Sequence, residues 1–60
     1  MKYRIEVRGV GYDDYTVDVD APSLREAKRH ELKAKVDWCE HNDIDVDSAF
    51  EMPFTRVTKI

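Results

Sequence analysis

Cysteine, proline and glycine are scarce in this chain of 60 residues, which has one cysteine, two prolines and two glycines. A single cysteine, Cys39, cannot form an intramolecular disulfide, so the cross-links that stabilise many small secreted proteins are excluded. This composition predicts a reducing compartment and a cytoplasmic protein, in the producing cell or in a host cell. The length allows a single domain over residues 1–60, and a domain of this size buries only about 60% of the surface that its unfolded chain exposes.

The chain also lacks a long hydrophobic run. Charged and apolar residues alternate from the N-terminus, and no stretch has the length of a membrane span or of the apolar region of a signal peptide. We therefore expect no membrane association. The net charge of −3 at pH 7 argues against a general attraction to nucleic acid, because nucleic-acid-binding domains are normally basic.

Apolar residues two positions apart predict two strands, over residues 2–8 and about 14–21. Their shared apolar face consists of Tyr3, Ile5, Val7, Tyr15, Val17 and Val19. Gly9 and Gly11 lie between the strands and suit the turn of a β-hairpin. Antiparallel pairing then brings basic residues of the first strand opposite acidic residues of the second, which favours this hairpin. The basic set is Lys2, Arg4 and Arg8, and the acidic set is Asp14, Asp18 and Asp20.

The segment after the second strand predicts one helix. Ser23 and Glu26 have the spacing of a capping box, and long helix-forming side chains continue to about His41 or Asn42. The apolar residues of this helix form two stripes, one of Ala27, Ala34 and Trp38 and another of Leu32, Val36 and Cys39. Between the stripes lie the charged residues Lys28, Glu31 and Lys35.

Two interpretations of the divided helix compete. In the first, the helix lies obliquely over the sheet and the lysine stems follow the edge of the core. In the second, one stripe packs on the sheet and the other contacts a second chain. The second interpretation predicts a homodimer in which Leu32, Val36 and Cys39 are the self-association residues.

The last strand is predicted over about residues 50–60. Phe50, Met52 and Phe54 share one face, Val57 breaks the alternation, and Pro53 suits an edge strand with an irregularity. Residues 43–49 predict a connection, with a short strand as the alternative. The fold class is therefore α+β, a ββαβ domain whose three-stranded antiparallel sheet has the first strand in the centre and one helix packed on one face. The outer face carries Lys2, Arg4, Arg8, Asp14, Thr16 and Asp18, exposed to water or to a partner.

The acidic loop has the D-x-D-x-D spacing that begins an EF-hand calcium site, in Asp43, Asp45 and Asp47. Ser48 and Phe54 stand where that site needs glycine and glutamate, so the spacing predicts a solvated loop rather than a calcium site.

The residues His30, Cys39 and His41 do not form a zinc or nucleophile site, because on one helix the two histidines are about 16 Å apart. A nucleophilic Cys39 would also need an adjacent base and an orienting group. We therefore expect no metal, no cofactor and no enzymatic activity.

Charge segregation is the strongest functional feature, since no lysine or arginine lies between Lys35 and Arg56. The acidic residues of this stretch, which we call the acidic lobe, are Asp37, Glu40, Asp43, Asp45, Asp47 and Glu51. Together with the nearby Trp38, they predict a docking surface for a basic, unidentified protein partner, while the competing interpretation is solubility alone. The alternative function is nucleic-acid-associated regulation through the basic face of the first strand, Lys2, Arg4 and Arg8.

Residues 17–27, with the sequence VDVDAPSLREA, follow the order strand, capped helix within a strand–strand–helix–strand chain. This pattern resembles the small ββαβ proteins carried by phages and mobile elements, such as the DpnD/PcfM-like family. The resemblance implies a short accessory protein of viral or mobile-element origin that has no catalytic residue. The resulting hypothesis is a non-enzymatic accessory protein that acts by protein–protein contact.

Overall fold

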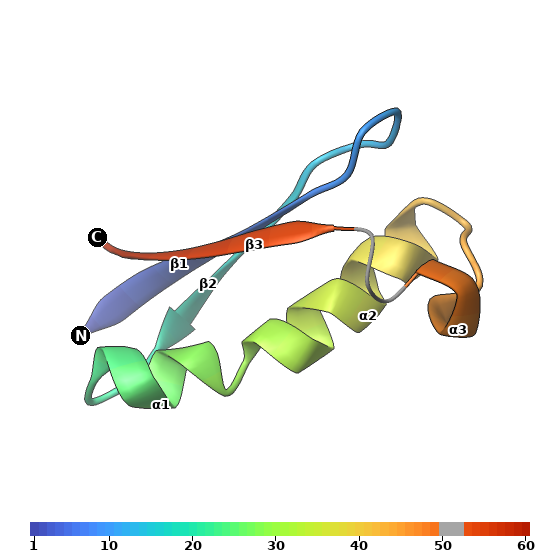
Figure 1. Cartoon of the computed structure of the whole chain (residues 1–60). Helices are drawn as coiled ribbons and strands as arrows, with labels where there is room; N and C mark the ends of the chain where they lie inside the picture. The colour runs from blue at the N-terminus through green and yellow to red at the C-terminus, as the bar shows by residue number, and fades with distance from the viewer. Residues whose placement is uncertain (50–52) are drawn as a thin grey trace.

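The structure is a computed structural model, and it describes residues 1–49 and 53–60. The element order is β1 (Lys2–Arg8), β2 (Tyr15–Asp20), α1 (Leu24–Lys28), α2 (Glu31–His41), α3 (Val46–Ala49) and β3 (Phe54–Lys59). β1 pairs antiparallel with both other strands, in the order β2-β1-β3 (Figure 1). The helices cover one face of this sheet. The predicted α+β architecture, ββαβ with the first strand central, is therefore confirmed.

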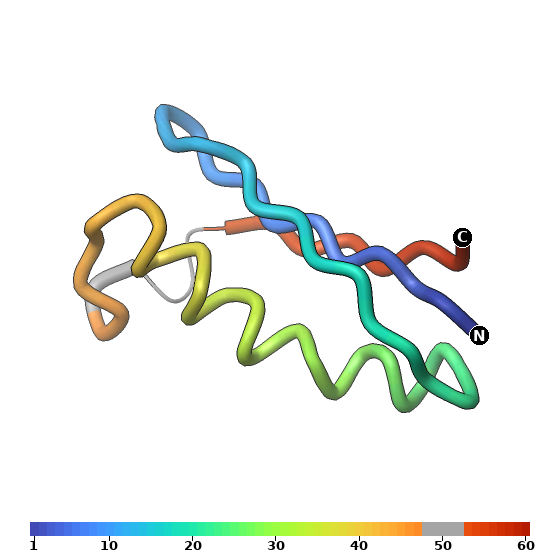
Figure 2. The backbone as a smooth tube through the Cα atoms, turned by 180° about the vertical axis from the view of Figure 1, so that it is seen from behind, coloured from blue at the N-terminus to red at the C-terminus, as the bar shows by residue number. Residues whose placement is uncertain are grey.

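The chain termini lie at one end of the elongated molecule, and the turn of the β1–β2 hairpin lies at the other. Figure 2, seen from behind, shows both termini at the same end of the molecule as α1, and the β1–β2 turn at the other end, which also holds α3. The view in Figure 1 gives the same arrangement. This places the tip of the hairpin close to the acidic segment that follows α2.

The core lies between the sheet and α2. The register pairs Tyr3 with Val19, Ile5 with Val17 and Val7 with Tyr15. The β1 residues of this face are buried and the β2 residues are half-buried, as the alternation predicted. From α2, the buried side chains that close this core are Ala34, Trp38 and Cys39.

The single predicted helix is divided into α1 and α2. The N–H groups of Arg29 and His30 donate to the carbonyls of Glu26 and Ala27, three residues earlier, at 3.2 and 3.0 Å. Such bonds are typical of a short 3₁₀ segment. The division separates two core clusters, because Ala27 of α1 packs with Tyr3, whereas the buried residues of α2 pack with Ile5 and Val7.

Capping interactions mark the start of α1 and the end of α2, and only the cap at the start of α1 was predicted from the sequence. Ser23 accepts a hydrogen bond from the N–H of Glu26 at 3.3 Å, as the capping-box spacing predicted. At the other end, Asp43 has φ 56° and the N–H of Ile44 donates to the carbonyl of Cys39 at 2.9 Å. This geometry is a Schellman motif.

The segment 43–49 contains α3 in place of the predicted connection. Asp45 Oδ1 accepts from the N–H of Asp47 at 3.0 Å and so caps the start of α3. The alternative of a short strand at Ile44 and Val46 is therefore wrong.

β3 begins at Phe54, later than the predicted start near residue 50. Phe50 and Met52, and the face predicted for them, lie outside the described residues. The register pairs Val57 with Ile5 on the covered face and Phe54 with Arg8 on the outer face. Alternation is therefore regular through Val57, and Phe54 is 75% exposed. Pro53 is buried directly before the strand.

Candidate functional site

The turn of the β1–β2 hairpin is tied to the end of α2 by hydrogen bonds. Trp38 Nε1 donates to the carbonyl of Asp13 at 2.9 Å, and Asn42 Nδ2 donates to the same carbonyl at 3.1 Å. In return, the N–H of Asp13 donates to Asn42 Oδ1 at 2.8 Å. The backbone of Asp13 is thus held beside the last turn of α2, although 29 positions separate it from Asn42.

This connection adds Asp13 to the acidic segment. Its carboxylate is largely exposed, and Asp13 Oδ2 lies 3.9 Å from His41 Nε2. Asp13 lies between the two predicted strands, and no sequence signal pairs such a turn with a helix end so far along the chain.

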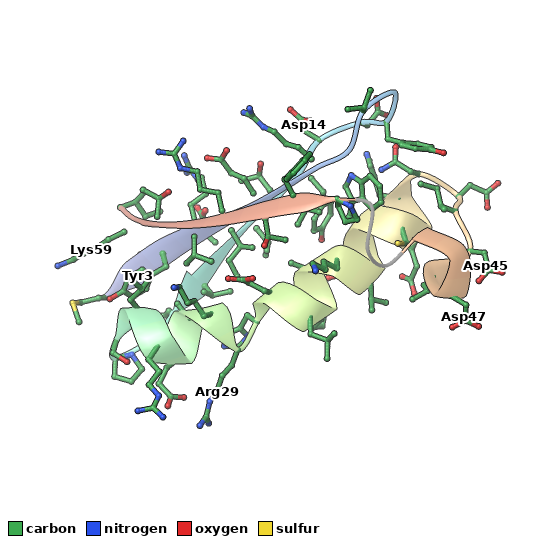
Figure 3. The ribbon with its side chains drawn as sticks, in the orientation of Figure 1. Tyr3, Asp14, Arg29, Asp45, Asp47 and Lys59 are labelled. Atoms are coloured by element: carbon green, nitrogen blue, oxygen red, sulfur yellow. The ribbon has the colours of Figure 1, made fainter. Side chains whose placement is uncertain are left out.

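Five exposed acidic residues gather at this end of the molecule. We call them the acidic end: Asp13, Glu40, Asp43, Asp45 and Asp47. In Figure 3, Asp45 and Asp47 point away from the ribbon beside α3. Among the described residues, the only basic side chain within 4.0 Å of these carboxylates is the imidazole of His41. Their negative charge is therefore directed to solvent.

The structure corrects the prediction for Trp38 and distinguishes Asp37 from the other residues of the acidic lobe. Trp38 is fully buried, so it positions the hairpin and does not offer its side chain to a partner. Asp37 accepts from Lys33 Nζ at 3.0 Å, and this contact raises the pKa of Lys33. The negative charge of Asp37 is thus partly neutralised by Lys33, whereas the carboxylates of the acidic end have no such lysine partner among the described residues. Glu51 lies outside the described residues.

The predicted self-association stripe is not one surface. Leu32 is 60% exposed and Val36 is half-buried, but Cys39 is fully buried in the main core. The prediction that Cys39 is a self-association residue is therefore wrong, because its side chain packs among residues of the sheet and α2. Burial raises the pKa of the Cys39 thiol, and the nearby charges of Asp45 and Glu40 act in the same direction.

The cations of the β1 outer face are exposed, and they lie beside acidic residues in or next to β2; both features were predicted. Arg4 donates to both oxygens of Asp18, at 3.0 and 3.4 Å. This bidentate pair lowers the pKa of Asp18.

Arg8 lies 3.5 Å from carboxylate oxygens of both Glu6 and Asp14, the latter labelled in Figure 3, and Lys2 is opposite Asp20 in the register. A phosphate backbone would have to compete with these contacts. Nucleic-acid binding by Lys2, Arg4 and Arg8 stays a prediction.

The described residues offer no enclosed site for a small ligand. They contain neither a pocket nor a group of three His, Cys, Asp or Glu side chains placed to hold a metal ion. Within residues 1–49 and 53–60, none of the helices has the length and apolar composition to cross a membrane. What the structure does offer is the exposed acidic end.

Comparison with known proteins gave no relative, because no protein-family model, curated protein or solved structure matches the chain. The resemblance to the DpnD/PcfM-like family stays a prediction.

Proposed function

We propose that this chain is a small, non-enzymatic accessory protein, of phage or mobile-element origin and of DpnD/PcfM-like type, that works in the cytoplasm. In this proposal it acts by protein–protein contact, and the acidic end docks on a basic surface of the partner. Complementary charge of this kind accelerates association and selects among partners.

The observation that carries the proposal is the convergence of the hairpin turn on the end of α2. The bonds to Trp38 and Asn42 hold the backbone of Asp13, and so they place its carboxylate at the same end of the molecule as those that follow α2. Because these backbone positions are held by hydrogen bonds and a helix cap, the charges are presented in a defined arrangement and little ordering is needed on binding.

The test is capture of a partner from a host lysate by the immobilised protein, followed by identification of the bound protein. The variant is the triple substitution Asp43→Asn, Asp45→Asn and Asp47→Asn. Asparagine tolerates the positive φ of position 43 and caps a helix as well as aspartate does, so the variant removes charge and keeps the backbone.

A matched control removes the same amount of negative charge away from the acidic end, by Asp18→Asn, Asp20→Asn and Glu26→Gln. We expect the control to retain the captured protein and the triple variant to lose it, with capture by the wild type weakening as salt is added. Equal capture by wild type and triple variant, or equal loss in both variants, would contradict docking through the acidic end.

A further inference from the structure

The outer edge of β3 is unpaired in the described part of the chain, because β3 is last in the strand order. In Figure 1 no labelled element crosses in front of it. On its inner side, the N–H of Ile60 donates to the carbonyl of Lys2 at 2.9 Å. Bonded and non-bonded pairs alternate in an antiparallel ladder, so the even-numbered residues of β3 bond to β1. The outward N–H and C=O groups therefore belong to Thr55, Val57 and Lys59.

These outward groups are complementary to those of an antiparallel copy of the same strand. When Val57 faces Val57 of a second copy, Thr55 faces Lys59 in both directions, and every outward group gains a partner. The arrangement has a two-fold axis at Val57, as the common type of homodimer requires.

Neighbouring registers are less favourable. A shift in one direction sets Arg56 opposite Arg56 and brings Pro53, which has no N–H, opposite Lys59. A shift in the other direction sets Ile60 opposite Arg56. Of these three registers, only the one centred on Val57 brings apolar side chains together on the outer face.

Those apolar side chains are Phe54 and Ile60, which are 75% and 53% exposed. In the register centred on Val57, each Phe54 lies opposite Ile60 of the other copy, so two large exposed hydrophobic pairs are covered. On the helix side, Lys59 of the second copy comes opposite Thr55. The hydroxyl of Thr55 donates to Glu31 Oε2 at 3.0 Å, so a carboxylate is close to the incoming cation.

The other edge of the sheet does not favour self-pairing. The N–H of Ala21 donates to the carbonyl of Met1 at 2.9 Å, so the odd-numbered residues of β2 bond to β1. The backbone N–H and C=O groups of Asp18 and Asp20 therefore point outward. Every antiparallel register that keeps most of β2 paired with its copy sets two aspartates opposite each other, which is destabilising.

We propose that the chain forms a two-fold symmetric homodimer through β3, in which two three-stranded sheets join into one of six strands. This interface differs from the helix stripe of Leu32 and Val36, and it does not depend on the acidic end.

The register is tested by cysteine cross-linking. Along one strand, Phe54 and Ile60 are about 20 Å apart, so cysteines at both positions cannot bond within a chain. In the proposed dimer, each lies opposite the other residue of the second copy. We expect Phe54→Cys/Ile60→Cys to form a covalent dimer under mild oxidation, whereas Phe54→Cys alone and Ile60→Cys alone form no covalent dimer. The native Cys39 is buried and is present in all of these variants.

The interface is tested independently by sedimentation equilibrium over a wide concentration range. We expect twice the chain mass for the wild type and for Leu32→Lys, a control at an exposed hydrophobic residue of α2, and the monomer mass for Phe54→Lys/Ile60→Lys. All three substituted residues are exposed, so the circular dichroism spectra of both variants should match that of the wild type. A monomeric wild type, a monomeric Leu32→Lys with a dimeric Phe54→Lys/Ile60→Lys, or equal cross-linking by the single cysteine variants would overturn the proposal.

Discussion

The indole ring of Trp38 lies directly against the backbone of Gly9. A Cβ atom added at Gly9 would be 2.4 Å from Trp38 Cζ2 and 2.8 Å from Cη2, closer than real contacts allow. On another side, the ring of Tyr12 meets that of Trp38 edge to face, with centroids 5.5 Å apart. Gly9 is therefore required by close packing, and Trp38 joins the hairpin turn to α2 through both ring contacts and its hydrogen bond to Asp13.

This packing predicts that Gly9→Ala is destabilising by about 1–3 kcal/mol, the usual range for an overpacked site. In a Trp38→Phe background the added methyl group should cost much less, because phenylalanine lacks the two ring atoms that it would meet. Urea unfolding of the two single variants and the double variant measures this coupling.

Gly11→Ala is the control for that cycle. Gly11 has φ 84° and nothing within 4 Å of an added Cβ, so its substitution costs about 1–2 kcal/mol of backbone strain. That cost should be the same with Trp38 or phenylalanine at position 38. A Gly9→Ala penalty that is also unchanged between the two backgrounds would refute the packing explanation.

Asn42→Ala should loosen the hairpin turn from α2. It removes both side-chain bonds to Asp13 and the bond from Nδ2 to the carbonyl of Trp38, and we expect a loss of about 1–3 kcal/mol in the free energy of unfolding. Hydrogen exchange at the amide of Asp13 should accelerate more than exchange in β1. Unchanged protection of that amide would show that Asn42 does not hold the turn.

Cys39 should react slowly with thiol reagents in the folded protein and rapidly in urea, since its side chain is fully buried.

The raised pKa of Cys39 means that the folded state binds the thiol proton more tightly than the unfolded state does. This contribution to stability is complete below about pH 8.5, the pKa of an exposed thiol, and is lost as the pH rises toward the folded value. We expect Cys39→Ala to lose less stability between pH 8 and pH 10 than the wild type, as read from urea midpoints; identical slopes would argue against a titrating buried thiol.

The ion pair of Arg4 and Asp18 predicts that the stability of the fold depends on pH at low pH. Arg4 lowers the pKa of Asp18, so the stabilisation is present above the unfolded value of about 3.9 and is lost as the pH falls through the lower folded value. NMR titration of the Asp18 carboxyl should give a higher pKa in Arg4→Gln than in the wild type. Lys33→Gln, which leaves this pair intact, serves as the control and should leave the titration of Asp18 unmoved.

The strands and the covered face of the sheet were predictable because alternation with period two is a local property. Tyr3, Ile5 and Val7 could be assigned to one face without knowledge of their partners, and the order of the strands followed from chain direction and the crossover rule. The division between α1 and α2 was not predictable, because good helix-forming residues span Arg29 and His30. It arises where the helical segment passes from one core cluster to the other.

By itself, the sequence determined the α+β class, the central first strand, the capped start of α1 and the surplus of carboxylates after Lys35, since each depends on spacing or composition within a short stretch. Tertiary structure alone decided that Trp38 and Cys39 are core residues and that Asp13 joins the acidic end. These outcomes depend on which segments approach each other in space, and side-chain packing and hydrogen bonds between distant positions select that approach.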